Sequence, residues 1–473
     1  RGLLMKQIIS RIHEIIKEAD NLIEFEERVY QYMFTLFEEC VGEVFTQIDQ
    51  VIKEHKRQEE WTFKRTDDKT IQFMFGSVQF KHTLMGDDGG QSRYPFDEWL
   101  GIRKYQRYSP LVEVKVAEMA SESTYREVAR VLKEWTPVHI SHQTVGSIVK
   151  RVGQVQEQAD KDEVIELEES ASLPEGKKVD FLFVEADGVY VRETQRGKHH
   201  EVSHALIYEG WIKQGKRISL KHPQYIMTTQ KTEDFWKEVQ SYVAHRYSLE
   251  QTQVVTNSDG GRGYTADKFQ EAFSQSKYYV LNQLDKYHIY QALNRALGHK
   301  TTDYKREIKK AIHNRDWDHF VLWMDTYEST LEEDEKIENL HVFRTYIQNN
   351  WERIFDWRDH VDNSPQNART MGAMESNQRH ITYRMKKRGM HWSKQGAEAI
   401  VKIKQGMLNQ TLRSAYLSNQ RRSVRKQRDV RRTIRLVQKL NQVTTNSSGV
   451  RNGSISLYAP HSSAIGQLVK SFK

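Results

Sequence analysis

The chain has 473 residues, of which 37% are hydrophobic and 29% charged, enough for about two to four domains with sizeable cores. No apolar run reaches the roughly 18 residues of a membrane-spanning helix, and the N-terminal residues lack the charge order of a signal peptide. One cysteine, Cys40, excludes an internal disulfide and a cysteine-based zinc site, and a net charge of +8 favours a polyanionic partner.

The first segment, residues 1–58, is predicted to be helical. Its apolar residues recur at spacings of three and four, and no proline interrupts them. The pattern fits one long helix or a helical hairpin. It either packs on its own domain or serves as an arm for dimerisation or DNA binding.

Residues 59–108 change to short runs with the period of a strand. We expect a small antiparallel β element with strands at 61–65, 70–75 and 77–85 and turns at Asp67-Asp68 and 86–90. No residue pattern in this element indicates chemistry.

Residues 109–153 are predicted to contain short helices. The sequence TYRE at Thr124–Glu127 is a capping box, Pro137 breaks the helix that it starts, and Ser141 begins a second helix over 142–151. This fits a helix-turn-helix, although any two packed helices give the same pattern, so both interpretations stay open. In a helix-turn-helix, the residues placed to reach base edges would be Ser141, His142, Gln143 and Thr144. The acidic, polar residues 154–178 are predicted to be a linker.

Residues 179–298 alternate between β-branched runs and helical patterns. The predicted order is strands at 181–191, 202–209 and 217–226, a helix at 232–247, a strand at 253–257, a helix at 265–274, a strand at 278–283 and a helix from Lys286. This is the order of an α/β RNase-H-like core, in which the first strand is central and the fourth lies beside it. An all-helical insertion at 299–362 would separate it from the rest of the core, residues 363–395.

Two of the predicted strands deliver carboxylates. The run FLFVEADGVYV places Asp187 at what we expect to be a strand end, and Gly188 leaves room there for a ligand. Asp259 follows the strand at 253–257, and Glu375 lies far downstream on a basic, helix-like segment. Glu185 shares a strand face with Asp187 and is a rival ligand; we expect it to lie behind Asp187.

Two strand-end aspartates and a helical glutamate among basic residues predict a two-metal site for phosphoryl transfer on nucleic acid. Two Mg²⁺ ions, with Mn²⁺ as a substitute, would be held by the oxygens of Asp187, Asp259 and Glu375. Close carboxylates repel one another without a cation, which favours this interpretation. The alternative is chance, because a chain with 64 acidic residues places some of them at strand ends.

Two further groups of residues border this predicted site. Asp285 and His288 follow the last strand and would orient water, a phosphate or a flap, or form a structural pair. Basic residues flank Glu375 and would hold a DNA backbone at the metals, or form a solvated helix face; they are Arg379, Lys386, Lys387 and Arg388. The C-terminal region, 396–473, is predicted to be a basic helix with a mobile tail. Its predicted DNA contacts are Arg421, Arg422, Arg425, Lys426, Arg428, Arg431 and Arg432.

The sequence resembles the ISLre-two family of bacterial insertion-sequence transposases. The resemblance rests on EADGVYV, the NSDGG turn, LDKYH and ESNQRHITYRMKKRGMHWS, together with FGSVQF, FDEWLGI and TYREVARVL, so it spans most of the chain. It implies a DDE transposase with an RNase-H-like core, a helical insertion and the triad Asp187, Asp259 and Glu375. The Asp285 and His288 pair matches a motif shared with related transposases.

The resemblance also implies partners and a location. The expected partner is double-stranded DNA, both the terminal inverted repeats of the element and its target. We expect a homodimer or higher oligomer in the bacterial cytoplasm, associated with the nucleoid. Two alternatives remain: a domesticated DNA-binding relative without cleavage activity, and an RNase-H-like structure-specific nuclease.

Overall fold

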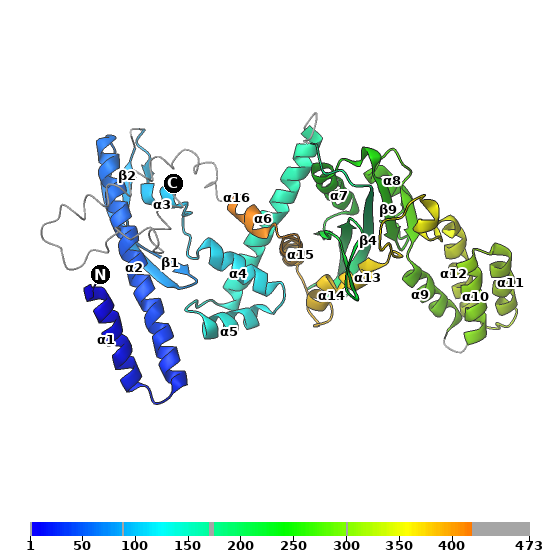
Figure 1. The fold of residues 1–473 in the computed structure, drawn as a ribbon, viewed down its shortest axis with the longest axis horizontal. Coiled ribbons are helices and arrows are strands. Elements are labelled where there is room, and N and C mark those ends of the chain that lie inside the picture. Colours follow the sequence, from blue (N-terminus) through cyan, green and yellow to red (C-terminus); the bar gives the residue numbers. More distant parts are fainter. Residues whose placement is uncertain (1, 88, 170–174, 299–300, 419–473) are drawn as a thin grey trace. The chain divides into compact units, whose positions relative to one another are not determined.

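The computed structural model describes residues 2–87, 89–169, 175–298 and 301–418. The chain separates into two compact units, one made of residues 1–152 and 413–473 and the other of residues 153–412 (Figure 1). The seven basic residues predicted to bind DNA between Arg421 and Arg432 lie outside the described residues. Among the described helices, none combines the length and the apolar character needed to cross a membrane.

The first unit begins with a helical hairpin and a small sheet. Its elements are α1 (Gly2–Glu18), α2 (Leu22–Gln58), β1 (Thr62–Phe73), β2 (Gly76–Gly86), β3 (Ser92–Arg93) and α3 (Pro95–Leu100). The turn predicted at Asp67-Asp68 is wrong, because β1 runs through both residues. They pair with His82 and Lys81 on β2, so the antiparallel ladder continues through the expected turn.

Several helices follow, and the last of them shows that the predicted linker at residues 154–178 is wrong. The helices are α4 (Pro110–Ala120), α5 (Tyr125–Trp135) and α6 (His142–Glu169), and α16 (Leu412–Ser418) also begins at the boundary of this unit. The second predicted helix does not end near residue 151, since α6 continues through most of the acidic segment. Contacts at helical spacing stabilise it: Lys161 pairs with Glu157 at 2.6 Å, and Gln156 donates to Asp160 at 2.9 Å.

A mixed five-stranded sheet forms the centre of the second unit. Its strand order is β10-β9-β4-β5-β8, with β4 parallel to β9 and antiparallel to β5. The strands are β4 (Phe181–Arg192), β5 (His199–Tyr208), β8 (Gln224–Thr228), β9 (Gln253–Ser258) and β10 (Leu281–Leu284). The predicted strand at 217–226 is interrupted at Pro223, which has no backbone N–H. Its first part, β7 (Arg217–Leu220), pairs instead with β6 (Trp211–Gln214).

Helices cover one face of this sheet, and aromatic side chains pack on the other. Because side chains alternate along a strand, Leu182, Val184 and Ala186 share one face and join the core formed with α7 (Thr232–Arg246) and α8 (Ala266–Ala272). On the opposite face, the rings of Phe183 and Trp357 lie 5.0 Å apart. Asp187 belongs to this second face.

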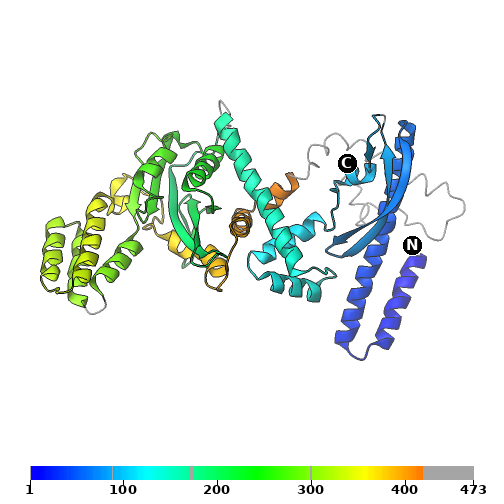
Figure 2. The ribbon, with the colours of Figure 1, turned by 180° about the vertical axis from the view of Figure 1, so that it is seen from behind.

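The predicted insertion is helical and has its own apolar core. Its helices pack with α9 (Lys286–Leu297) beside the sheet (Figures 1 and 2). They are α10 (Thr302–Asn314), α11 (Trp317–Glu328), α12 (Asp334–Asn349) and the 3₁₀ turns η2 (Trp351–Arg353) and η3 (Trp357–His360). The chain then returns to the sheet through α13 (Ala373–Asn377), α14 (Arg379–Met385) and α15 (Lys394–Leu408).

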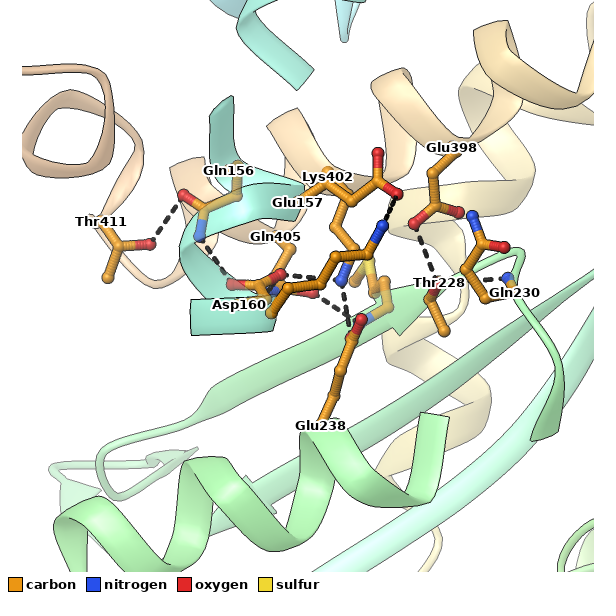
Figure 3. A network of polar contacts seen from close by, with 12 residues as sticks. Gln156, Glu157, Asp160, Thr228, Gln230, Glu238, Glu398, Lys402, Gln405 and Thr411 are labelled. Carbon is orange, nitrogen blue, oxygen red and sulfur yellow. Dashed lines mark hydrogen bonds and ion pairs between the residues drawn. The ribbon is translucent and has the colours of Figure 1, made fainter. Parts of the chain in front are cut away.

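A buried polar network attaches α15 to the second unit. Figure 3 shows the ammonium of Lys402, which has no exposed surface, lying 2.7 Å from Asp160 on α6 and 2.6 Å from Glu238 on α7. Beside it, Glu398 accepts a hydrogen bond from the hydroxyl of Thr228 on β8 at 2.8 Å. Each carboxylate in this network has a donor, so the network is complete without a bound ligand.

Candidate metal centre

The register of two parallel strands brings Asp187 and Asp259 together. The pairing of β4 with β9 ends at Glu185 opposite Asn257, and each aspartate lies two residues beyond its strand's last partner. Asp259 directly follows β9, as predicted. Asp187 is not at a strand end, because β4 continues to Arg192 through its antiparallel pairing with β5.

Asp187, Asp259 and His288 form the candidate metal centre. One ligand atom from each residue lies within 4.8 Å of the other two, and all three side chains are partly exposed. Within the described parts of the chain, no lysine or arginine makes an ion pair with either aspartate. Their hydrogen bonds come from uncharged groups, such as the backbone N–H of Gly261, which donates to Asp259 at 2.8 Å. The carboxylate oxygens of both aspartates are therefore not taken up by a lysine or arginine of the described chain, and His288 is the basic side chain beside them.

Burial and mutual repulsion raise the pKa of Asp187. The pKa lies at about 6, mainly because burial disfavours the charged carboxylate and also because Asp259 is nearby. Part of the Asp187 population is therefore protonated near pH 6, where a divalent cation would compete with that proton.

His288 enters the cluster because Asp285 positions it. The side chain of Asp285 caps α9 by accepting from the N–H of Tyr287 at 2.8 Å, and its other oxygen lies 3.3 Å from Nδ1 of His288. This hydrogen bond raises the pKa of His288, with nearby carboxylates contributing. A carboxylate behind an imidazole is the usual support of a metal-binding histidine, which binds in its neutral form after losing a proton.

Glu375 is not part of the cluster in this structure, which corrects the predicted convergence of three carboxylates. It lies exposed on α13, and the group of ligand atoms within 4.8 Å contains His288 instead. The side-chain amide of Gln378, three residues after Glu375, donates a hydrogen bond to Asp187. Residues three apart lie on the same side of a helix, so the segment that carries Glu375 is next to the site.

Glu185 holds this segment in place and is not a ligand. Its carboxylate is fully buried and accepts hydrogen bonds from the hydroxyl of Tyr208 at 2.7 Å and from the backbone N–H of Met374 at 2.8 Å. The N–H groups of Gly372 and Ala373 lie within 3.3 Å of the same carboxylate. Burial raises the pKa of Glu185, while these donors act in the opposite direction. Glu185 is thus a positioning residue behind Asp187, as expected.

The predicted role of Gly188 is wrong. A side chain at this position would collide with the carboxylate of Glu201, and its Cβ would lie 3.2 Å from the hydroxyl of Tyr264. The space beside Gly188 is therefore occupied by the protein's own side chains, and the glycine allows close packing around β4 instead of ligand approach.

The donor set fits a divalent cation. Two carboxylates and one imidazole suit Mn²⁺, which accepts oxygen and nitrogen ligands, and the carboxylates also suit Mg²⁺. These three residues would provide the protein ligands of one ion. A second ion would need further oxygens. The carboxylate of Glu375 is on α13, whose following residue Gln378 contacts Asp187.

The predicted DNA-contacting residues that the structure describes are accessible. Ser141, His142 and Gln143 are exposed at the start of α6, where the hydroxyl of Ser141 accepts from the N–H of Thr144 at 3.1 Å. In the second unit, Arg379, Lys386, Lys387 and Arg388 are exposed on and just after α14.

Sequence reasoning missed two contributors to the site and gave a third, His288, a different role. It identified His288 only as an orienting group, and it missed Gln378 and Tyr346, whose hydroxyl donates to the backbone carbonyl of Asp259 at 3.1 Å. The spacing of Asp285 and His288 on a helix start was the available signal for His288. No pattern indicates Tyr346, because it reaches the site from the helical insertion.

Comparison with known proteins identifies the family. Residues 15–422 match the model of an uncharacterised protein family, UPF0236. A similar protein from Streptococcus gallolyticus, "UPF0236 protein in vanSb 3'region", is 31% identical over 401 residues, covering 83% of this chain and 84% of its own. A relative from Caldanaerobacter subterraneus is 24% identical over 406 residues, 84% of this chain and 80% of its own, and its name joins eleven locus labels, from TTE0033 to TTE2212. The chain therefore belongs to the UPF0236 family.

Proposed function

We propose that this protein is a DDE-type transposase of the ISLre-two kind, which binds the ends of an insertion sequence and catalyses metal-dependent DNA cleavage and strand transfer. The observation that carries the proposal is the convergence of Asp187 and Asp259 without a lysine or arginine partner in the described residues. Structural carboxylates are normally neutralised by protein groups, whereas a catalytic pair must remain free for cations.

The order of the strands supports an RNase-H-like core. The first strand of the unit, β4, is central, β5 and β8 follow on one side, and β9 and β10 lie in parallel on the other. This is the arrangement in which the first and fourth strands carry the two aspartates of such a site. The helical insertion lies between Asp259 and Glu375, as the resemblance implies.

The multiplicity of relatives supports a mobile element. One Caldanaerobacter name joins eleven loci and another joins four, so closely similar copies occur at several places in one genome. Repeated copies are what transposition produces.

Each residue of the site has a defined part in this proposal. Mg²⁺ or Mn²⁺, when bound, would stabilise the attacking and leaving oxygens of a phosphodiester. Asp187, Asp259 and His288 would hold the first ion. Asp285 keeps the ring of His288 in place, and Glu185 anchors α13 so that Glu375 can join the site when Gln378 releases Asp187.

DNA binding and assembly complete the proposal. The exposed cations after Glu375 would contact the backbone at the scissile phosphate, and the start of α6 would contact bases. The basic C-terminal segment would add contacts that are independent of sequence. Two element ends must be joined to one target, so at least a dimer is expected, with the α1–α2 hairpin as its interface.

The test uses the DNA that flanks the gene. The full chain should cleave a linear fragment carrying the element end in Mg²⁺ or Mn²⁺, and should not cleave a fragment of scrambled sequence. Cleavage of both fragments would indicate a structure-specific nuclease. Binding to the end with no cleavage in either metal would indicate a domesticated DNA-binding protein.

A further inference from the structure

A cavity in the second unit lies on α9, outside the candidate metal centre. It has a volume of about 340 Å³ and is bounded by α9, the end of α10 and residues 354–360. This volume is within the range of about 300–1,000 Å³ that small-molecule pockets occupy. None of its lining residues belongs to the three ligands Asp187, Asp259 and His288.

The rim of this cavity carries several basic side chains. They are Lys286 on α9, His313 and Arg315 at the end of α10, and His360 at the end of η3. Arg315 is exposed, and its guanidinium lies 3.5 Å from Glu352, an exposed pair of the kind that contributes little stability. Its charge is therefore available to an anion.

The cavity also carries two carboxylates, and a neighbouring arginine pairs with one of them. Asp356 and Asp359 contribute to the lining. The guanidinium of Arg358 lies 2.7 Å from Asp356, and this contact lowers the pKa of Asp356. With Asp356 paired to Arg358, the lining keeps the charges of Lys286 and Arg315 against the carboxylate of Asp359.

The interior of the cavity is apolar and aromatic. Ile289, Ile312 and Ile354 are buried and form its apolar lining, and the rings of Tyr290 and Phe355 line it as well. Each ring has a neighbour on the protein: the ring of His360 lies 4.4 Å from that of Phe355, and Nζ of Lys309 lies 5.1 Å from that of Tyr290. Aromatic surfaces accept any nucleobase by stacking, and cations beside them accept phosphate. An apolar interior with a cationic rim thus matches both halves of a nucleotide.

We propose that this cavity binds an unpaired nucleotide of a DNA strand, with the base against Phe355 and Tyr290 and the phosphates on Arg315, His313 and Lys286. The inference rests on the proposed function. Asp285, which positions His288, immediately precedes Lys286 on α9, so one helix serves both sites. A nucleotide held here would separate a strand from its duplex close to the scissile phosphate.

The test measures base binding by the full chain in EDTA, so it does not depend on cleavage. The probe is a single-stranded oligodeoxynucleotide containing 2-aminopurine, whose fluorescence changes when the base stacks on a protein ring. We expect a fluorescence change on binding. Phe355→Ala should reduce the affinity by about fivefold or more and remove most of this change.

Two further variants test whether binding depends on the cations of the rim, and not on the overall positive charge or on the stability of the fold. Arg315 has a left-handed backbone, with φ of 54°, so Arg315→Gly removes the guanidinium and suits the local conformation. It should weaken binding by about threefold or more and leave the melting temperature unchanged or higher. Lys310→Ala, at an exposed site of α10 outside the lining, is the matched loss of charge and should change affinity by less than about twofold.

Three results would overturn the proposal. One is binding of the oligonucleotide with no fluorescence change at any position of the probe. Another is equal weakening by Lys310→Ala and Arg315→Gly. The third is competition by free dAMP at the same concentration as the oligonucleotide, which would identify a site for a free nucleotide. A change in 2-aminopurine fluorescence with a protein that cleaves no DNA would instead support base binding in this cavity and refute the proposed transposase activity.

Discussion

The second unit contains two groups of carboxylates that differ in how their charge is balanced. Asp160 and Glu238 meet the buried ammonium of Lys402, whereas Asp187 and Asp259 meet no lysine or arginine within the described chain. The first group contains its own buried ammonium, whereas the only basic side chain that the described residues place in the second cluster is the imidazole of His288. Both groups are pairs of carboxylates, so the difference between them comes from what surrounds them.

The pKa shifts of the two groups differ in the sign of the nearest charge. Burial raises the pKa of Glu238 to about 7, while Lys402 acts in the opposite direction. Burial lowers the pKa of Lys402, but Asp160 and Glu238 outweigh it and the net shift is upward. The ammonium therefore stays charged and satisfies its partners. In the other group, burial and Asp259 both raise the pKa of Asp187, so the folded protein stores a repulsion that a cation would relieve.

The largest expected effect is the loss of cleavage when either aspartate is neutralised. Asp187→Asn or Asp259→Asn should lower the rate of end cleavage on the order of 10³-fold, because an ion loses a charged ligand. Asp180→Asn, an exposed aspartate just before β4, is the matched control and should cleave normally. Cleavage by Asp187→Asn at the rate of the unmodified protein would refute the catalytic assignment.

Replacing Lys402, the lysine of the other group, should lower the stability of the fold and not the rate of cleavage. Lys402→Met leaves Asp160 and Glu238 buried without their cation, and the free energy of unfolding should fall by about 3–5 kcal/mol. Urea unfolding at pH 7 measures this change. Lys394→Met, exposed at the start of the same helix, should change stability by less than about 0.5 kcal/mol. Equal values for the two variants would contradict the comparison.

Glu185 is a third case in this comparison, because this buried carboxylate is stabilised by N–H and O–H donors and not by a lysine. Glu185→Gln places an amide among donors that need an acceptor, so the free energy of unfolding should fall by about 1–3 kcal/mol. Tyr208→Phe removes only one of these donors and should cost less, about 1 kcal/mol. If Glu185→Gln left both stability and cleavage unchanged, Glu185 would not anchor α13.

The smallest expected effect is the pH dependence of cation binding. Because the pKa of Asp187 is about 6, the apparent affinity for Mn²⁺ should rise about tenfold between pH 5 and pH 7. Calorimetric titration at both pH values measures this change. In Asp187→Asn the dependence should be weaker but should persist in part, because His288, whose pKa is raised, must also lose a proton to bind the ion. An unchanged dependence would assign the titration to His288 or another group.

The same shift fixes the sign of a stability change in the metal-free protein. A carboxyl whose pKa is higher in the folded than in the unfolded state binds more protons when folded. Its contribution to stability is therefore present below about pH 4 and is lost as the pH rises through about 6. Asp187→Asn should be more stable than the unmodified protein at pH 7 without metal, and Mn²⁺ should reverse that order.

Much of the second unit could be predicted from the sequence, because its elements have strong local signals. The β-branched runs at β4 and β9 and the amphipathic pattern of α7 lie within a few residues of their predicted places. Where prediction was wrong, a local signal was overridden by packing. The acidic residues of α6 indicated a linker, but buried Val155 and the contact of Asp160 with Lys402 stabilise a helix there.

The sequence by itself determined which residues are available for chemistry and, through strand order, that Asp187 and Asp259 would meet. Only the tertiary structure decided that His288 completes the cluster, that Gln378 contacts Asp187 and that Glu375 stays outside. The physical reason is that α9 and α13 are positioned by long-range contacts. Asp285 orients His288 after β10, and Glu185 binds the start of α13 across 189 positions of the chain. No spacing within a helix or strand encodes such contacts, because they exist only when the distant segments have packed together.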